Sequence, residues 1–226
     1  MRRLVVFGAG SGSREVARLA QQINRAAPTW DLLGFVDADP TRVGGELDGL
    51  PVLPVAGLDA LVSDAGAPTY GCTGVMDPEV KQRIWRDEMQ PARIEPASLV
   101  HPSVELPHDF DAGPGLVLYA GVNVSFDVRL GAFVNVLFGA LLGHELRAGD
   151  FCTLLPGATL NGGCVLEERC LIGAKATLLP GVRIGAGSVV GVGSAIVEDV
   201  PPDTSIVSLP RQIARGRSRE VPARSA

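Results

Sequence analysis

Apolar residues recur at every sixth position from Val100 to Ile196. All seventeen positions of this series are Val, Leu, Ile or Ala. The position four residues further on is small or aliphatic in nearly every repeat, and glycine collects at the second and fourth positions. A six-residue unit cannot bury its own apolar side and must stack on the next unit. The pattern therefore predicts a solenoid.

The repeat length predicts a parallel β-helix with three flat faces, in which each hexad supplies one face and one corner. Three hexads complete a coil, so Leu142, Leu160 and Leu178 should stack inside the prism. Roughly five coils result, with glycines relieving the tight corners. A low-complexity tract could also give a short period, but it would not keep Val, Ile and Leu in register.

The N-terminal hundred residues follow a different pattern, in which strands and helices alternate. A buried strand over 3–8 runs into a glycine turn, and helical spacing of apolar residues follows it. A second strand over 32–36 ends at Asp37, and a later helix starts with Asp77 as its cap and Pro78 in its first turn. This alternation predicts a small parallel sheet of half-Rossmann size.

The junction between the two patterns is placed at 91–96. We therefore expect an α/β domain over 1–96, a β-helix over 97–210 and a basic tail over 211–226. The arginines of the tail are typical of a solvated terminus, and a ligand-binding role is the alternative.

The glycine turn is the first candidate site, because the first strand-to-helix turn of such a sheet binds phosphates. Ser13 stands where the third glycine of a full GxGxxG would be, and the domain is too short for two mononucleotide halves, which argues against NAD. A single nucleotide on an activated sugar would fit. The candidate residues are Gly10, Ser11, Gly12, Ser13, Asp37 and Ala38. A docking domain with an empty turn is the alternative.

Composition narrows the class of partner. The net charge of −5 and the pI near 5.2 argue against nucleic acid and anionic membranes, which reward a basic surface. No apolar run approaches the roughly 18 residues of a membrane span. The chain reaches its first strand by Leu4, which leaves no room for a signal peptide and predicts a cytoplasmic protein.

The cysteines have no metal-binding or disulfide spacing. Cys152, Cys164 and Cys170 occupy inward positions of their hexads, and Cys72 stands alone in the N-terminal part. We expect the first three to be small core residues.

His144 is the second candidate site. It follows Gly143 at a corner of a coil and is followed by Glu145, so its side chain should point outward into an intersubunit groove. A neutral imidazole there could take a proton from an amine or hydroxyl that attacks a thioester, and Glu145 would fix the tautomer. A surface role is the alternative. A zinc site is not expected, because His101 and His108 lie some two coils away.

The whole chain resembles the hexapeptide-repeat sugar acetyltransferases of the NeuD/PglD type. The resemblance rests on residues 5–10, 14–16, 34–37, 142–145 and 197–201. It implies a left-handed β-helix, a homotrimer, acetyl-CoA in the grooves between β-helices, and a nucleotide-linked sugar on the N-terminal domain. It also implies that His144 is the base and Glu145 its partner. By the same matching, the residues of the acetyl-CoA groove are Thr153, Gly162, Ala174 and Val192.

Four departures from the family pattern accompany these matches, with Leu137 and Phe138 counted as one. Gly12 replaces a common histidine, Leu137 an asparagine, and Thr153 a second groove histidine, while Phe138 replaces a small polar residue. The closing Gly-Asn-Pro-Ala pattern has also changed at 208–211. A more apolar pocket around Leu137 argues for a different acceptor.

Three interpretations stay open. The first is N-acetylation of a nucleotide-linked amino sugar. The second is an O-acetyl transfer, a less polar acceptor or a longer acyl donor. The third is a non-catalytic trimeric scaffold or sensor, because fold alone does not fix function.

Overall fold

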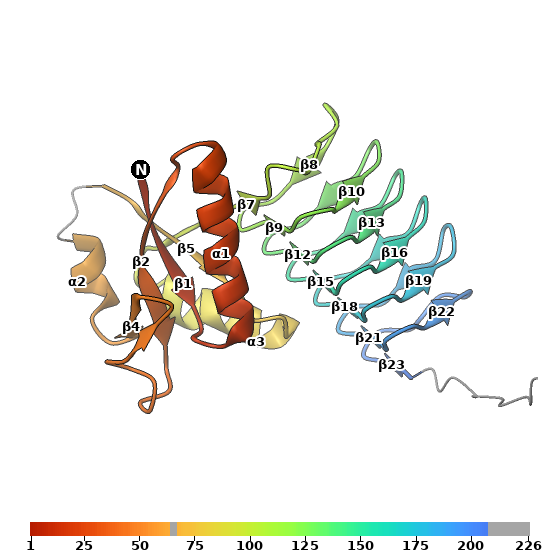
Figure 1. The fold of residues 1–226 in the computed structure, drawn as a ribbon. Coiled ribbons are helices and arrows are strands. Elements are labelled where there is room, and N and C mark those ends of the chain that lie inside the picture. The colour runs from red at the N-terminus through yellow and green to blue at the C-terminus, as the bar shows by residue number, and fades with distance from the viewer. Residues whose placement is uncertain (64–66, 208–226) are drawn as a thin grey trace, which may run out of the picture.

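The computed structural model describes residues 1–63 and 67–207 (Figure 1). Within them, an α/β part packs on one side of a β-solenoid. The predicted basic tail and the changed closing pattern at 208–211 lie outside the described residues. The helices of the described residues do not combine the length and the hydropathy that a membrane span requires.

The α/β part holds a six-stranded sheet in the order β3-β4-β2-β1-β5-β6. All pairs are parallel except the β3–β4 hairpin, which confirms the predicted small parallel sheet. The central strand β1 has a continuous apolar run because it is covered on both sides. The strands are β1 (Arg2–Phe7), β2 (Trp30–Asp37), β3 (Glu46–Leu47), β4 (Leu50–Pro54), β5 (Thr69–Thr73) and β6 (Glu95–Pro96).

Three α-helices and a π-helical turn accompany this sheet: α1 (Ser11–Ala26), α2 (Leu58–Ser63), α3 (Pro78–Ile84) and η1 (Trp85–Met89). The predicted helix start at Asp77 is confirmed. The Asp77 carboxylate accepts hydrogen bonds of 3.0 Å from the backbone N–H groups of Glu79 and Val80, and Pro78 opens the helix.

The solenoid has three faces built from two-residue strands, as predicted. The covered face consists of β7 (Leu99–Val100), β9 (Val117–Leu118), β12 (Asn135–Val136), β15 (Thr153–Leu154), β18 (Leu171–Ile172), β21 (Val189–Val190) and β23 (Ser205–Ile206). The charged face consists of β8 (Asp111–Ala112), β11 (Arg129–Leu130), β14 (Arg147–Ala148), β17 (Val165–Leu166) and β20 (Arg183–Ile184). The neutral face consists of β10 (Asn123–Val124), β13 (Leu141–Leu142), β16 (Thr159–Leu160), β19 (Thr177–Leu178) and β22 (Ala195–Ile196).

The second residue of each strand points into the prism. Leu142 pairs with Leu160, and Leu160 with Leu178, in the predicted register, and all three are fully buried. The three solenoid cysteines are fully buried in the same core, as predicted. The fifteen strands from β8 to β22 make five coils, which matches the expected number.

Leu106 does not follow its repeat. It belongs to the apolar series, yet residues 101–110 form a loop, and Leu106 is 43% exposed. In the described part of the chain, no strand lies beyond β10 at that edge of the neutral face. Pro102 and Pro107 flank the position, and proline cannot donate to a strand ladder. The sequence pattern therefore extends further toward the N-terminus than the regular solenoid does.

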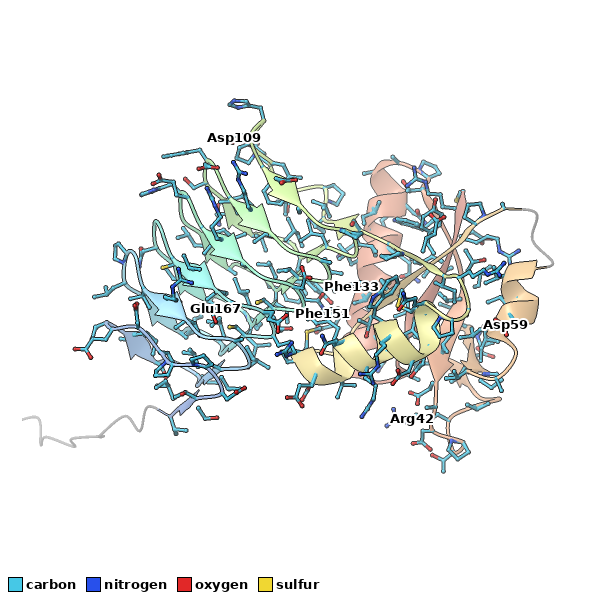
Figure 2. All side chains as sticks on the ribbon, turned by 180° about the vertical axis from the view of Figure 1, so that it is seen from behind. Arg42, Asp59, Asp109, Phe133, Phe151 and Glu167 are labelled. Carbon is cyan, nitrogen blue, oxygen red and sulfur yellow. The ribbon has the colours of Figure 1, made fainter. Side chains whose placement is uncertain are left out.

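The α/β part is fixed on the covered face. The fully buried Lys81 Nζ donates to the Cys152 carbonyl (3.0 Å) and to Thr153 Oγ1 (2.9 Å). Phe133 stacks on Phe151 (Figure 2). The ring of Trp85 packs against Phe133. Strand β6 joins the α/β sheet and β7 the solenoid. That the two parts are separate domains divided at 96/97 stays a prediction.

Burial lowers the pKa of Lys81 to about 7, so the unfolded chain binds the extra proton between about pH 7 and 10.5. Wild type should therefore gain stability relative to Lys81→Met as the pH rises through this window. The free energy of unfolding of wild type minus that of Lys81→Met should rise by up to about 1.4 kcal/mol per pH unit. Urea unfolding of both proteins at pH 7.5 and 9.5 measures it, and a difference that does not change with pH would contradict the shift.

Candidate functional site

A cavity of about 590 Å³ lies at the carboxyl ends of β1, β2 and β5, where parallel sheets bind ligands. We call it the N-terminal cavity. It brings together every residue that the sequence suggested for the acceptor: Gly10, Ser11, Gly12, Ser13, Asp37, Ala38 and Leu137. Leu137 comes from the solenoid corner after β12, so the cavity is closed by both parts of the chain.

Asp37 braces the glycine turn. Its Oδ2 accepts a hydrogen bond from the backbone N–H of Ala9 (2.7 Å), and its Oδ1 accepts one from that of Asp39 (2.9 Å). Arg42 Nη1 lies 3.2 Å from Oδ2. The carboxylate thus shapes the cavity wall and ties Arg42 to it.

Gly12 lies against the backbone of Gly74 so closely that no side chain fits. A Cβ at position 12 would lie 2.3 Å from the Gly74 carbonyl oxygen, and a Cβ at position 74 would lie 2.3 Å from the Ser13 nitrogen. This contact gives a packing reason for glycine where the resembling family commonly has histidine.

Gly12→Ser should therefore destabilise the protein by about 1–3 kcal/mol, the usual cost of overpacking. Gly10→Ser is the matched control, because no atom lies within 4 Å of a Cβ at position 10 and serine is a favourable helix cap. Urea unfolding compares the two variants, and equal stabilities would contradict the close contact.

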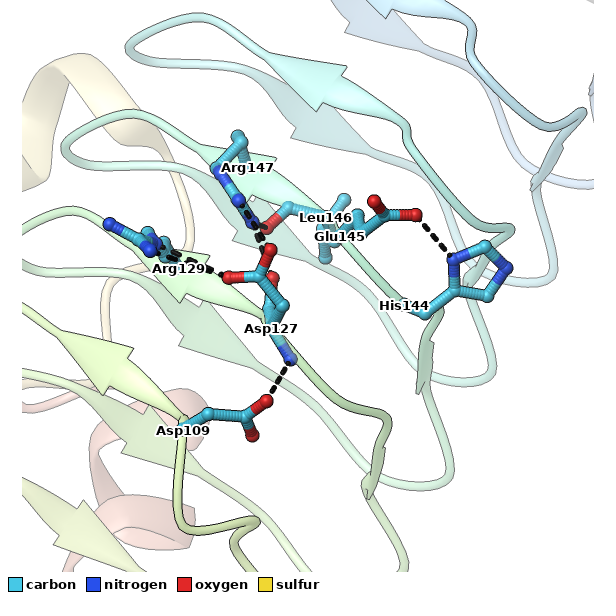
Figure 3. A network of polar contacts seen from close by, with 7 residues as sticks. All are labelled: Asp109, Asp127, Arg129, His144, Glu145, Leu146 and Arg147. Carbon is cyan, nitrogen blue, oxygen red and sulfur yellow. Dashed lines mark hydrogen bonds and ion pairs between the residues drawn. The ribbon is translucent and has the colours of Figure 1, made fainter.

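His144 lies at the edge of a second cavity of about 460 Å³, the His144 groove. The groove runs along the neutral face and is lined by residues that include Asn123, Leu141, His144, Asn161 and Gly162. His144 Nδ1 lies 3.0 Å from Glu145 Oε2 (Figure 3), and the histidine side chain is 51% exposed. Glu145 has a left-handed backbone (φ 58°), which turns its carboxylate beside its neighbour. With Nδ1–H donating to Glu145, Nε2 is left to accept a proton.

An ion-pair network supports the backbone of this corner (Figure 3). Arg147 Nη2 lies 2.8 Å from Asp127 Oδ2, and its Nη1 donates to the Asp127 carbonyl. The Asp127 backbone N–H donates to Asp109 Oδ2 (3.0 Å). The hydrogen bond from Arg147 holds the pKa of the Asp127 carboxyl below its usual value. The corner that carries His144 and Glu145 is therefore linked to the coils before it.

Comparison with known proteins identifies the fold and its chemistry. No family model matches the chain. GDP-perosamine N-acetyltransferase of Escherichia coli O157:H7 is 27% identical over 188 residues, which cover 80% of this chain and 82% of that protein. PerB from Caulobacter crescentus, solved in complex with CoA and GDP-perosamine, superposes with a TM-score of 0.81 at 27% identity over 95% of this chain and 98% of that one.

A second solved structure agrees. The acetyltransferase domain of PglB from Neisseria gonorrhoeae, in complex with acetyl coenzyme A, gives a TM-score of 0.78 at 26% identity over 90% of this chain and 95% of that one. The chain is similar over nearly its whole length to hexapeptide-repeat sugar acetyltransferases, as the sequence predicted. The predicted left-handed β-helix and the acetyltransferase class are confirmed.

In this acetyltransferase the residues suggested for the acetyl-CoA groove lie in three places. Gly162 lines the His144 groove. Ala174 and Val192 lie at corners between the covered and neutral faces, after β18 and β21. Thr153 is fully buried on the covered face and bonded to Lys81, so a contact between its side chain and acetyl-CoA does not fit this structure.

Sequence reasoning missed Phe126. Its ring stacks on the imidazole of His144, with centroids 5.2 Å apart and planes 9° from parallel. The sequence could have revealed this residue, because residue 126 precedes residue 144 by one coil of 18 residues and so occupies the same corner position.

His101 has a local role: its Nδ1 accepts a hydrogen bond from the Ser103 backbone N–H (3.0 Å). Among the described residues, no three His, Cys, Asp or Glu side chains are grouped to hold a metal ion.

Proposed function

We propose that this acetyltransferase transfers the acetyl group of acetyl-CoA to the amino group of a nucleotide-linked sugar, with His144 as the general base. The observation that carries the proposal is the His144–Glu145 pair, 3.0 Å apart at the edge of an open groove. Relatives whose names include N-acetyltransferase, and a neighbour in complex with GDP-perosamine, support the choice of acceptor class.

The reaction needs one base and a polarised thioester. His144 Nε2 takes a proton from the amine as its nitrogen attacks the thioester carbonyl. The tetrahedral intermediate then collapses, the carbon–sulfur bond breaks, and the imidazolium returns its proton to the CoA thiolate. Glu145 holds the tautomer and stabilises the imidazolium between these steps.

The N-terminal cavity is proposed to hold the nucleotide-linked sugar. The glycine turn lets the backbone approach a phosphate, and the N-terminus of α1 faces it with unpaired N–H groups. Arg42 and Arg83 also line the cavity and offer positive charge to a diphosphate. Leu137 leaves its solenoid wall apolar.

The two sites are proposed to meet between copies of the chain. The N-terminal cavity lies beside the covered face, whereas His144 lies on the opposite edge of the prism, between the neutral and charged faces. Outward residues of the neutral face carry no charge, which suits a subunit contact: Asn123, Leu141, Thr159, Thr177 and Ala195. A homotrimer would place the edge with Ala174 and Val192 beside the neighbour's His144 groove. Light scattering should give three chains, and a monomer would remove the shared site.

A less polar acceptor is the second candidate. It is favoured by Leu137, which is buried in the wall of the N-terminal cavity, and by Phe138, which packs on Tyr119 with ring centroids 4.7 Å apart. The close contact between Gly12 and Gly74 explains the glycine by packing, without loss of activity. This weakens the argument that the protein is a scaffold that has lost its active site.

A free-thiol assay with acetyl-CoA tests the function against GDP- and UDP-linked amino sugars and their hydroxyl counterparts. We expect CoA release and an acetylated product with an amino sugar only. Release with a hydroxyl counterpart would favour O-acetylation. Binding of either ligand in calorimetry, with no CoA released from acetyl-CoA in the presence of any acceptor, would contradict the proposed transfer and support a sensor.

A further inference from the structure

Three successive coils place Phe126, His144 and Gly162 one above another at the same corner. The strands before them are in register: β10 pairs with β13, and β13 pairs with β16. Backbone hydrogen bonds continue through the corner itself. The N–H of Glu145 donates to the Phe126 carbonyl (3.0 Å), and that of Gly163 donates to the His144 carbonyl (2.8 Å). The backbone therefore fixes the spacing of the column.

The imidazole is confined between its two neighbours in this column. Phe126 stacks on it from one coil earlier, at 5.2 Å and 9°. Gly162 leaves the space on the following coil, because a Cβ there would lie 2.2 Å from His144 Nε2. Glu145 holds the ring edge at Nδ1. Together these contacts define the plane of the ring and the direction of Nε2.

Packing alone does not account for Phe126. Its side chain is 56% exposed, and it belongs to none of the hydrophobic clusters formed by the described residues. An exposed aromatic ring parallel to an imidazole offers the negative face of its π system to a cation. A cation forms at this position when the imidazole takes the substrate proton.

We propose that Phe126 is a positioning residue for acetyl transfer. It holds the plane of the His144 ring so that Nε2 meets the attacking amine, and its face stabilises the imidazolium. The inference rests on the proposed role of His144. Because Phe126 acts through the histidine, it should affect the chemical step and leave the affinity for acetyl-CoA unchanged.

Phe126→Leu keeps the apolar volume and removes the aromatic face. We expect kcat to fall about tenfold with the KM for acetyl-CoA unchanged. Phe126→Tyr keeps the aromatic face and should retain most of the wild-type activity. Leu106→Ala is the control for loss of an exposed apolar side chain and should behave as wild type. A raised KM with unchanged kcat would mean that Phe126 binds acetyl-CoA, which overturns the inference. A kcat for Phe126→Tyr as low as that for Phe126→Leu would overturn the inference as well.

Combination with His144→Ala separates this inference from the proposed function. If Phe126 acts through His144, adding Phe126→Leu to His144→Ala causes no further loss of rate. Wild-type turnover by His144→Ala alone would refute the general base. An inactive His144→Ala together with a fully active Phe126→Leu would refute only the positioning role.

Discussion

Replacing His144 with alanine is expected to lower kcat for CoA release by about 10²–10⁴-fold, the usual contribution of a general base. The amine would then lose its proton to water while attacking the thioester. Because the side chain is half exposed and its backbone bonds belong to the coil ladder, the fold should persist. Initial rates of thiol release at saturating substrates measure the effect.

Two controls accompany this variant. Calorimetry should show that His144→Ala still binds CoA, and light scattering should show an unchanged oligomer. His108→Ala is the matched substitution, because His108 is exposed and lies outside the residues that line both cavities. Wild-type turnover by His144→Ala would refute the mechanism, and an equal loss in His108→Ala would show that the effect is not specific.

Gly162→Ala is expected to lower kcat by about 100-fold through a single added carbon, since displacement of a catalytic group by about 1 Å can cost that much. The new Cβ would lie 2.2 Å from Nε2 and 2.3 Å from Cε1 of His144, so the ring must leave its position. The ring can move toward solvent, which keeps the loss of stability small.

Urea unfolding and CoA-release rates together check this prediction. The backbone of Gly162 lies outside the left-handed region, so the His144 ring is the nearest obstacle to alanine. Any destabilisation should therefore disappear when Gly162→Ala is combined with His144→Ala. Unchanged kcat in Gly162→Ala would show that the ring position observed here does not matter for catalysis.

The solenoid could be predicted because its six-residue period follows directly from geometry. The same period placed Leu142 over Leu160 and assigned Cys152 to the core. It failed at Leu106, where flanking prolines and a loop replace the strand. A periodic pattern shows which residues can face inward. How far the hydrogen-bonded strands extend depends on the backbone N–H groups that are available to donate.

The candidate site was predictable only where sequence neighbours act together. His144 and Glu145 are adjacent, and the glycine turn is one segment, so both could be suggested from the chain. The burial of Thr153 depends on α3 packing on one particular face through Lys81, which no local pattern reveals. Phe126 was accessible through the coil period of 18 residues, because stacking in a solenoid relates residues at that spacing.

The two cavities of one chain lie across the prism from each other, so we propose that each active site combines the N-terminal cavity of one chain with the His144 groove of another. Gly10 lines the N-terminal cavity, and no atom lies within 4 Å of a Cβ at this position, so the side chain of Gly10→Trp has room to fill the cavity and block it. His144→Ala leaves the cavity open and makes the groove inactive. Each variant alone should be inactive.

Co-expression of the two variants, followed by an assay of CoA release from the mixed oligomers, tests whether the site is shared between chains. With random assembly of equal amounts, about a quarter of the sites would pair an intact cavity with an intact His144, so about a quarter of wild-type activity should return. Mixed oligomers that contain both chains and remain inactive would contradict a site shared between subunits.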